Sequence, residues 1–234
     1  MIELINKNVE KFGHHITVVG SGAEPRYAYT VGVTQKLGFE LLFAGGLYFM
    51  YNEVLEIIDA VVNHLQKSPN DMQFRVKSYG DFKIAKVHHS WSGLMMLGYF
   101  DYYKTTDVKV FQVIPDSQHY TFDIPDMSVE WKELSEPVWK WLSKKWEYPF
   151  PESSTVVTNI DSLRGKKITE VMRWQFDEWE AFAGSGPDVK KEEVRVIPIG
   201  TLLGLDFSLE PVLHLNIGKG IWRDETDLIW HDWN

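Results

Sequence analysis

The chain has two pairs of consecutive histidines, His14-His15 and His88-His89. Histidine is the side chain best suited to acid–base chemistry near neutral pH. Successive side chains of a strand point to opposite faces, so each pair is expected to bring at most one imidazole into a common site. A metal site needs several converging ligands, and the chain has no H-E-x-x-H, no H-x-H and no regular carboxylate spacing around the pairs. We therefore predict no metal site and ordinary surface or half-buried histidines.

The segment Arg26–Gly32 (RYAYTVG) is the most motif-like part of the chain. In a strand, Tyr27 and Tyr29 would share one face, and Gly32 would permit a close approach of the backbone. The segment could line a ligand pocket together with one histidine, or it could be a strand packed tightly around small residues. The candidate ligand-binding residues are Tyr27, Tyr29, Thr30, Gly32, His88 and His89.

Several familiar signatures of enzymes are absent from the sequence. The lack of cysteine excludes disulfides, Cys-ligated metals and thiol nucleophiles. No phosphate loop, no G-x-G-x-x-G, no G-x-S-x-G elbow and no S-x-x-K is present. Asp116 and the tail residues Asp224, Glu225 and Asp227 could act as acids or bases, but surface turns explain them equally well. We assign no catalytic residue and no cofactor, and we favour a function without catalysis.

The elements that would position these residues can be read from periodicity. Apolar residues at helical spacing predict a first helix over Ile2–Phe12 and a second over residues 52–67, with Asn52 as its cap. A further helix is predicted over Ser135–Tyr148, and WSGLMMLGYFDYY fits either a helix or a strand. The expected strands are HHITVVG, RYAYTVGV, ELLFAG, VKVFQVIPD, YTFDI, TVVTNI, ITEVMRWQF, WEAFAG, VRVIPI and a hairpin over FRVKSYGDFKIAKVHH.

Strands and helices do not alternate regularly, which favours an α+β fold of mainly antiparallel sheets with a few packed helices. The proline- and serine-rich stretch YPFPESS predicts the boundary between two closely packed subdomains. Residues 1–150 would form an α+β subdomain that holds the YAYTVGV strand. Residues 151–234 would form an acidic, tryptophan-rich, mainly β subdomain.

Charge and tryptophan are concentrated late in the chain. Residues 118–234 carry 21 acidic and 13 basic side chains, and nine of the ten tryptophans follow Trp91. This pattern suits a basic protein partner, although the charges could also merely solvate a surface and the tryptophans fill a core. It disfavours nucleic acid, which requires clustered Lys and Arg. The candidate partner-binding residues are Trp222, Asp224, Asp227, Trp230 and Trp233.

The sequence also bears on location. No run of 18 apolar residues occurs, and the first residues lack a basic segment followed by an apolar one. We therefore expect a soluble, cytoplasmic protein that neither spans a membrane nor carries a signal peptide.

Several short blocks resemble an uncharacterised bacterial family, over about residues 10–125. RYAYTVGV, then Glu40-Leu41 and Gly46-Leu47, are similar to its pattern "faYTvGl … g-hPEL … Gl". FGHHITVV and VFQVIPD are similar to segments before and after it. The family's usual His-Pro before Glu-Leu is Gly38-Phe39 here. Any chemistry that depends on that histidine is therefore missing from this chain.

A second resemblance covers the later part of the chain. ITEVMRWQFDEWEAFAG is similar to a hairpin of small bacterial proteins encoded near polymorphic toxins, with Trp179 at the position of the hairpin tryptophan. EEVRVIPIGTLLGLDFSLEPVLHL looks like the segment that often follows it. This resemblance implies an immunity protein or a general bacterial module, and it brings no catalytic residue with it.

Three hypotheses follow. The first is an immunity protein that neutralises a toxin by binding directly to the basic domain of that toxin. The second is a small-molecule-binding protein or enzyme with a pocket around RYAYTVG. The third is a structural or assembly protein that uses its apolar tail as a contact between subunits.

Overall fold

The computed structural model describes residues 2–233, which divide into two compact units. The first unit comprises residues 2–19, 26–120 and 124–132, and the second comprises residues 20–25, 121–123 and 133–233. Residues 133–150, which the YPFPESS stretch assigns to the first subdomain, belong to the second unit. One reason is that the indole Nε1 of Trp141 donates to the carbonyl of Gly200, 3.3 Å away.

The first unit is built on a six-stranded sheet in the order β1-β2-β3-β6-β5-β4. The pair β3–β6 is parallel and the other pairs are antiparallel. The predicted strands over HHITVVG, RYAYTVGV, ELLFAG and VKVFQVIPD and the predicted hairpin are confirmed, whereas YTFDI forms turns. The strands are β1 (His15–Val19), β2 (Tyr27–Val31), β3 (Glu40–Ala44), β4 (Gln73–Val76), β5 (Gly80–Lys86) and β6 (Val110–Pro115).

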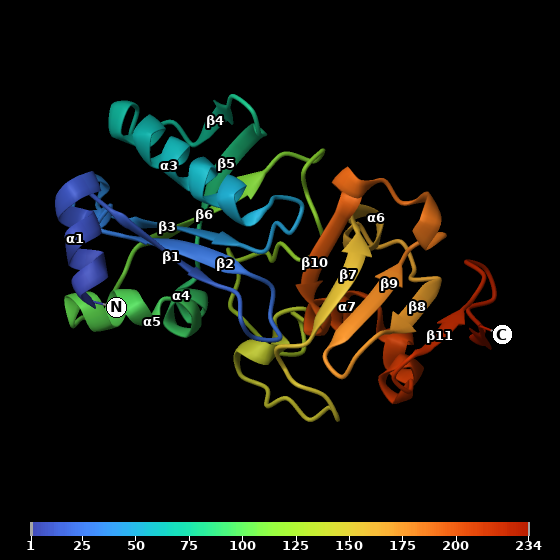
Figure 1. Cartoon of the computed structure of the whole chain (residues 1–234). Coiled ribbons are helices and arrows are strands. Elements are labelled where there is room, and N and C mark those ends of the chain that lie inside the picture. Colours follow the sequence, from blue (N-terminus) through green and yellow to red (C-terminus); the bar gives the residue numbers. More distant parts are fainter. Residues whose placement is uncertain (1, 234) are drawn as a thin grey trace. The chain divides into compact units, whose positions relative to one another are not determined.

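Figure 1 shows α3 on one side of this sheet and α4 and α5 on the other. The predicted first helix is confirmed, and the ambiguous segment WSGLMMLGYFDYY forms α4 and α5. The predicted cap Asn52 is wrong: α3 starts one residue earlier, and the N–H of Met50 donates to Oε2 of Glu53, 2.7 Å away. The helices are α1 (Ile2–Phe12), α2 (Thr34–Leu37), α3 (Tyr51–Lys67), α4 (His89–Met95) and α5 (Leu97–Tyr103).

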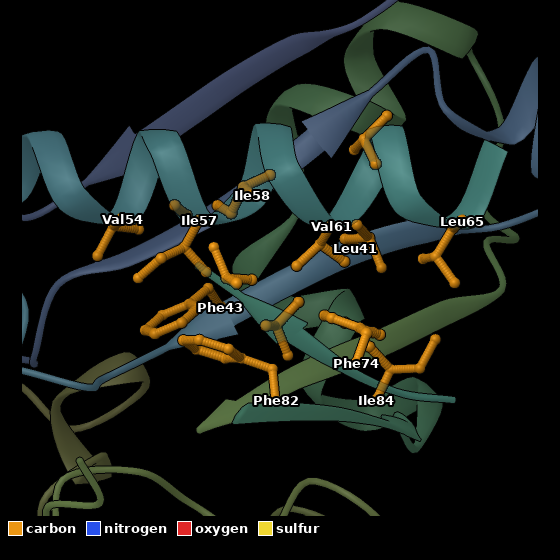
Figure 2. Packing of buried hydrophobic residues seen from close by; sticks show 14 of the residues in the cluster. Leu41, Phe43, Val54, Ile57, Ile58, Val61, Leu65, Phe74, Phe82 and Ile84 are labelled. Atoms are coloured by element: carbon orange, nitrogen blue, oxygen red, sulfur yellow. The ribbon is translucent and has the colours of Figure 1, made fainter. Parts of the chain in front are cut away.

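The main core of the first unit lies between α3 and the sheet. Ile57 and Val61 on α3 point toward Phe43 and Phe82 on the strands (Figure 2). Each such side chain, buried from water, contributes roughly 1.5–3 kcal/mol to stability. The apolar stripe of α3 and the apolar face of the strands therefore hold this side of the unit together.

The second unit also has a six-stranded sheet, in the order β10-β7-β9-β8-β11-β12. Here β7–β9 is the parallel pair and the other pairs are antiparallel. With two largely antiparallel sheets and separate helices, the α+β class is confirmed. The strands are β7 (Thr155–Asn159), β8 (Glu170–Arg173), β9 (Glu178–Phe182), β10 (Val194–Pro198), β11 (Lys219–Trp222) and β12 (His231–Asp232).

Helical segments pack on the inner face of this second sheet. Apolar side chains of β7, β8 and β9 meet those of α7 and η4 around a small apolar cavity, lined among others by Val156, Val171, Trp179, Leu202 and Val212. The sheet residues that alternate with these point the other way. The helical segments of the unit are α6 (Ile160–Leu163), α7 (Ile199–Leu205), η1 (Lys140–Leu142), η2 (Gly186–Asp188), η3 (Lys191–Glu193) and η4 (Phe207–His214).

The predicted helix over Ser135–Tyr148 is wrong, because only the short 3₁₀ segment η1 forms there. Trp139 and Trp141 are both buried although they stand two residues apart, a spacing that places side chains on different sides of an α-helix. Their indole N–H groups donate to the carbonyls of Asp123 and Gly200 respectively. These tertiary contacts override the local helical pattern.

Candidate binding surface

The side of the second sheet that points away from α7 and η4 is a candidate binding surface. Its residues follow from the register, in which Glu170 pairs with Phe182, and Met172 pairs with both Glu180 and Gly220. Side chains directly opposite each other in adjacent strands share a face. We call this surface the outer face; it includes Thr155, Val157, Glu170, Met172, Trp174, Glu178, Glu180, Phe182, Val196, Gly220, Trp222, His231 and Trp233.

Three tryptophans of the outer face are open to solvent. Trp174 is 53% exposed, Trp222 is 38% exposed and Trp233 is 43% exposed. Large aromatic side chains usually lie in the core or at interfaces, because the exposure of their apolar surface to water is unfavourable. Their grouping on one sheet face makes this face a candidate binding surface.

The end of the chain is held on this face by its backbone. The N–H of Trp233 donates to the carbonyl of Gly220, 3.1 Å away, and the Trp222 ring lies 4.9 Å from the ring of His231. A Cβ at Gly220 would come within 2.1 Å of the Trp233 indole. Glycine is thus required at position 220 for the indole to keep this position.

A groove of about 490 Å³ runs between these side chains. Its aromatic walls are Trp174, Trp233 and the mostly buried Phe182, and its carboxylates are Glu170 and Glu180. The remaining lining residues are Ser185, Gly186 and Pro187, so no Lys or Arg lines the groove.

The two carboxylates of the groove have different surroundings. Oε2 of Glu170 accepts a hydrogen bond from the N–H of Gly186, 2.8 Å away, which fixes the loop at the rim. Glu180 is half-buried, and its carboxylate makes no hydrogen bond or ion pair with any described residue. A carboxylate without a counter-charge beside aromatic rings is suited to a cation.

The predicted partner-binding residues divide between two sides. Trp222 and Trp233 lie on the outer face. Trp230 is half-buried, with the guanidinium of Arg223 4.1 Å from its ring centre. Asp224 is exposed, and Oδ1 of the exposed Asp227 accepts the N–H of Ile229, 3.1 Å away. Trp230 immediately precedes β12, and its contact with Arg223 could not be predicted without the structure of the tail.

Sequence reasoning missed Trp174, Glu170 and Glu180 as members of the site. Trp174 lies beside the turn between β8 and β9, and Glu180 stands in mid-strand. An available signal was the polar, period-two pattern of β9, in which glutamates at 178 and 180 flank the buried Trp179. That pattern places both glutamates on the side opposite the core.

The candidate ligand residues on β2 lie in a packed interior. Tyr27, Tyr29 and Thr30 are all buried. The hydroxyl of Tyr29 accepts the N–H of Gly98, 3.1 Å away. The hydroxyl of Thr30 donates to Oε2 of Glu40 over 2.5 Å. These contacts give the strand a structural role. One of their partners is Glu40, which the sequence alone did not indicate as an important residue.

The second histidine pair stands at the beginning of α4. The rings of His88 and His89 lie 4.3 Å apart, and Nδ1 of His88 is 2.9 Å from the hydroxyl of Ser90. Within residues 2–233, neither imidazole makes a hydrogen bond to a β2 candidate. The structure therefore does not join these histidines to the tyrosines through hydrogen bonds.

The first histidine pair lies beside a groove of the first unit. His14, His15 and Ile16 line this groove of about 290 Å³, together with Asn8 and Asp59. Nδ1 of His15 lies 2.8 Å from the side-chain amide nitrogen of Asn8, so the two rings have different partners. Nε2 of His14 lies 2.7 Å from Oδ1 of Asp59. Among the described residues, no cluster of three or more His, Asp or Glu could hold a metal ion.

Asp116 forms a tight network at the end of β6. Its Oδ1 is 2.7 Å from Nδ1 of His119, and its Oδ2 accepts the N–H of Asp81, 2.8 Å away. Burial alone would raise the pKa of Asp116, but the hydrogen bonds from Asp81 and His119 leave this pKa below its usual value. The Asp116 carboxylate therefore stabilises the turn at the end of β6.

Comparison with known proteins places part of the chain in a known family model. Residues 8–122 match the model of a family described as a domain of unknown function, DUF4262, consistent with the resemblance to an uncharacterised family over a similar range. No curated protein and no solved structure matches the chain. Separately, no helix within residues 2–233 has the length and apolar character needed to cross a bilayer.

Proposed function

We propose that this chain is a binding protein that neutralises a basic partner, in the manner of an immunity protein that blocks a toxin domain. The outer face of the second unit would make the contact. The observation that carries the proposal is the groove in which exposed tryptophans stand beside carboxylates with no Lys or Arg among the lining residues.

Two physical arguments support a protein partner. Exposed tryptophans are the residues that most often dominate the binding energy of protein interfaces. An acidic surface accelerates association with a basic protein and disfavours acidic competitors. Residues 118–234 hold an excess of eight acidic side chains, so long-range attraction and short-range anchoring act in the same direction.

The test is to mix the purified protein with the toxin domain encoded beside its gene and to measure the dissociation constant by calorimetry. Trp233→Ala removes an indole from the groove and is expected to raise Kd about 30-fold, the size typical of a hot-spot residue. A protein that forms no complex and gives cells no protection would refute the proposal.

A matched control separates this effect from general loss of aromatic surface. Phe207 is 68% exposed and lies on η4, which packs on the inner face. Phe207→Ala should change Kd less than about twofold, because Phe207 lies away from the outer face and would not contact the partner. Equal losses for Phe207→Ala and Trp233→Ala would place the interface elsewhere.

A further inference from the structure

The groove on the outer face combines segments that are distant in the chain. Trp174 comes from the turn after β8, and Trp233 comes from the end of the chain, beyond β12. Phe182, on β9, is opposite Glu170 in the sheet register. Three aromatic rings and two carboxylates thus share one concave surface of about 490 Å³.

No basic side chain among the lining residues balances the negative charge of the two groove carboxylates. Oε2 of Glu170 accepts the N–H of Gly186, while the carboxylate of Glu180 has no hydrogen bond or ion pair with any described residue. Glu180 is also half-buried, and a partly buried charge is screened by salt less than an exposed one. The groove therefore presents negative potential next to two indole rings.

We propose that the groove is a receptor for one cationic side chain, a lysine or arginine that the partner inserts between Trp174 and Trp233. This inference rests on the proposed function and names what the partner must carry at the centre of its interface. The ammonium or guanidinium group would pair with Glu180, and its aliphatic stem would lie against the aromatic walls. Norleucine, which has a similar apolar stem but no charge, would fit the walls and leave Glu180 unpaired.

The experiment uses the whole protein and small probes, so it needs no identified partner. Nα-acetyl-lysinamide, Nα-acetyl-argininamide and Nα-acetyl-norleucinamide are titrated at low salt while the ten indole N–H signals are followed by NMR. The signals of Trp174 and Trp233 are assigned with Trp→Phe variants. The cationic probes should shift these two signals selectively and bind about three- to fivefold more tightly than norleucine, the range of an exposed cation–π contact.

A pair of glutamates on the same strand supplies the control. Glu180→Gln removes the carboxylate that lines the groove, whereas Glu178→Gln removes the same charge two residues away, outside the lining. Glu180→Gln should abolish the preference for the cationic probes, and Glu178→Gln should preserve it. The inference is overturned if norleucine binds equally well, if both variants lose the preference, or if the shifts spread over all indole signals.

The outcome is separable from that of the proposed function. If the toxin domain binds but the probes show no charge preference, the partner uses the outer face without a caged cation, and only this inference fails. If the probes bind as expected while no toxin domain does, the cation site stands and the immunity function fails.

Discussion

At the scale of single residues, the buried carboxyl group of Glu40 connects the end of the RYAYTVG strand to the turn that follows it. Its Oε1 accepts the N–H groups of Gly32 and Thr34, each 3.0 Å away, and its Oε2 accepts the hydroxyl of Thr30. Gly32 has φ +109°, a conformation that other residues rarely adopt. The carboxyl group therefore locks the turn that follows β2.

Burial raises the pKa of Glu40 to about 7, although its hydrogen bonds from Thr30 and the turn partly oppose the shift. Its folded-state pKa lies above the ordinary value of 4.5, so the protonated carboxyl favours folding. This contribution to the free energy of unfolding is fully present below pH 4.5 and is lost as pH rises through about 7. The loss is about 3 kcal/mol, from the two pKa values.

Glu40→Gln mimics the protonated carboxyl and should remove this pH dependence. Urea unfolding of both proteins between pH 4.5 and pH 8 measures the effect. The free energy of unfolding of the variant should rise relative to wild type as pH rises, by about 3 kcal/mol over the range. A difference between the two proteins that stays constant with pH would contradict this role for Glu40.

A buried ion pair makes a second prediction at this scale. Arg223 has no exposed side-chain surface, and its guanidinium lies 3.0 Å from Oδ2 of Asp206. Asp206→Ala would leave the guanidinium buried without a counter-charge, and we expect it to lower the free energy of unfolding by about 3–5 kcal/mol. Lys167 reaches the same carboxylate but is 47% exposed. Lys167→Met should therefore cost less than about 1 kcal/mol in the same denaturation measurement.

At the scale of elements, the short strand β12 depends on close contact with β11. Gly220→Ala would place a Cβ where the Trp233 indole lies, so the end of the chain should detach from the sheet. We expect faster hydrogen exchange at residues 231–233 and a loss of affinity similar to that of Trp233→Ala. Gly218→Ala is the control for adding a methyl group near β11, because a Cβ at Gly218 meets no atom within 4 Å. Gly218 has φ +77°, so its variant should lose stability without displacing Trp233.

Elements with a strong apolar period could be predicted from the sequence, and elements fixed by tertiary contacts could not. The stripe of α3 and the strands from β1 to β3 follow from local spacing. The segment around Trp139 and Trp141 has helical spacing too, yet each indole is fixed by a distant carbonyl. For the same reason the groove could be foreseen only in part. Trp222 and Trp233 stand in a conspicuous tail, while Glu180 gains its role from strand register.

At the scale of the whole molecule, the two units divide the properties of the chain. The first unit holds nearly all of the range that matches DUF4262 and buries the RYAYTVG strand. The second unit holds the outer face and most of the acidic excess. We therefore expect the interaction with a basic partner to map onto the second unit, and its association rate to fall as salt rises.

The central claim is that a basic partner covers the outer face, and hydrogen–deuterium exchange of the complex with the toxin domain tests it most directly. Binding slows amide exchange where a partner covers the backbone or stabilises local structure. We predict slower exchange in β8, β9, β11 and the residues after β12, with unchanged exchange in α1 and α3. Slower exchange confined to the first unit, or no change anywhere, would contradict the claim.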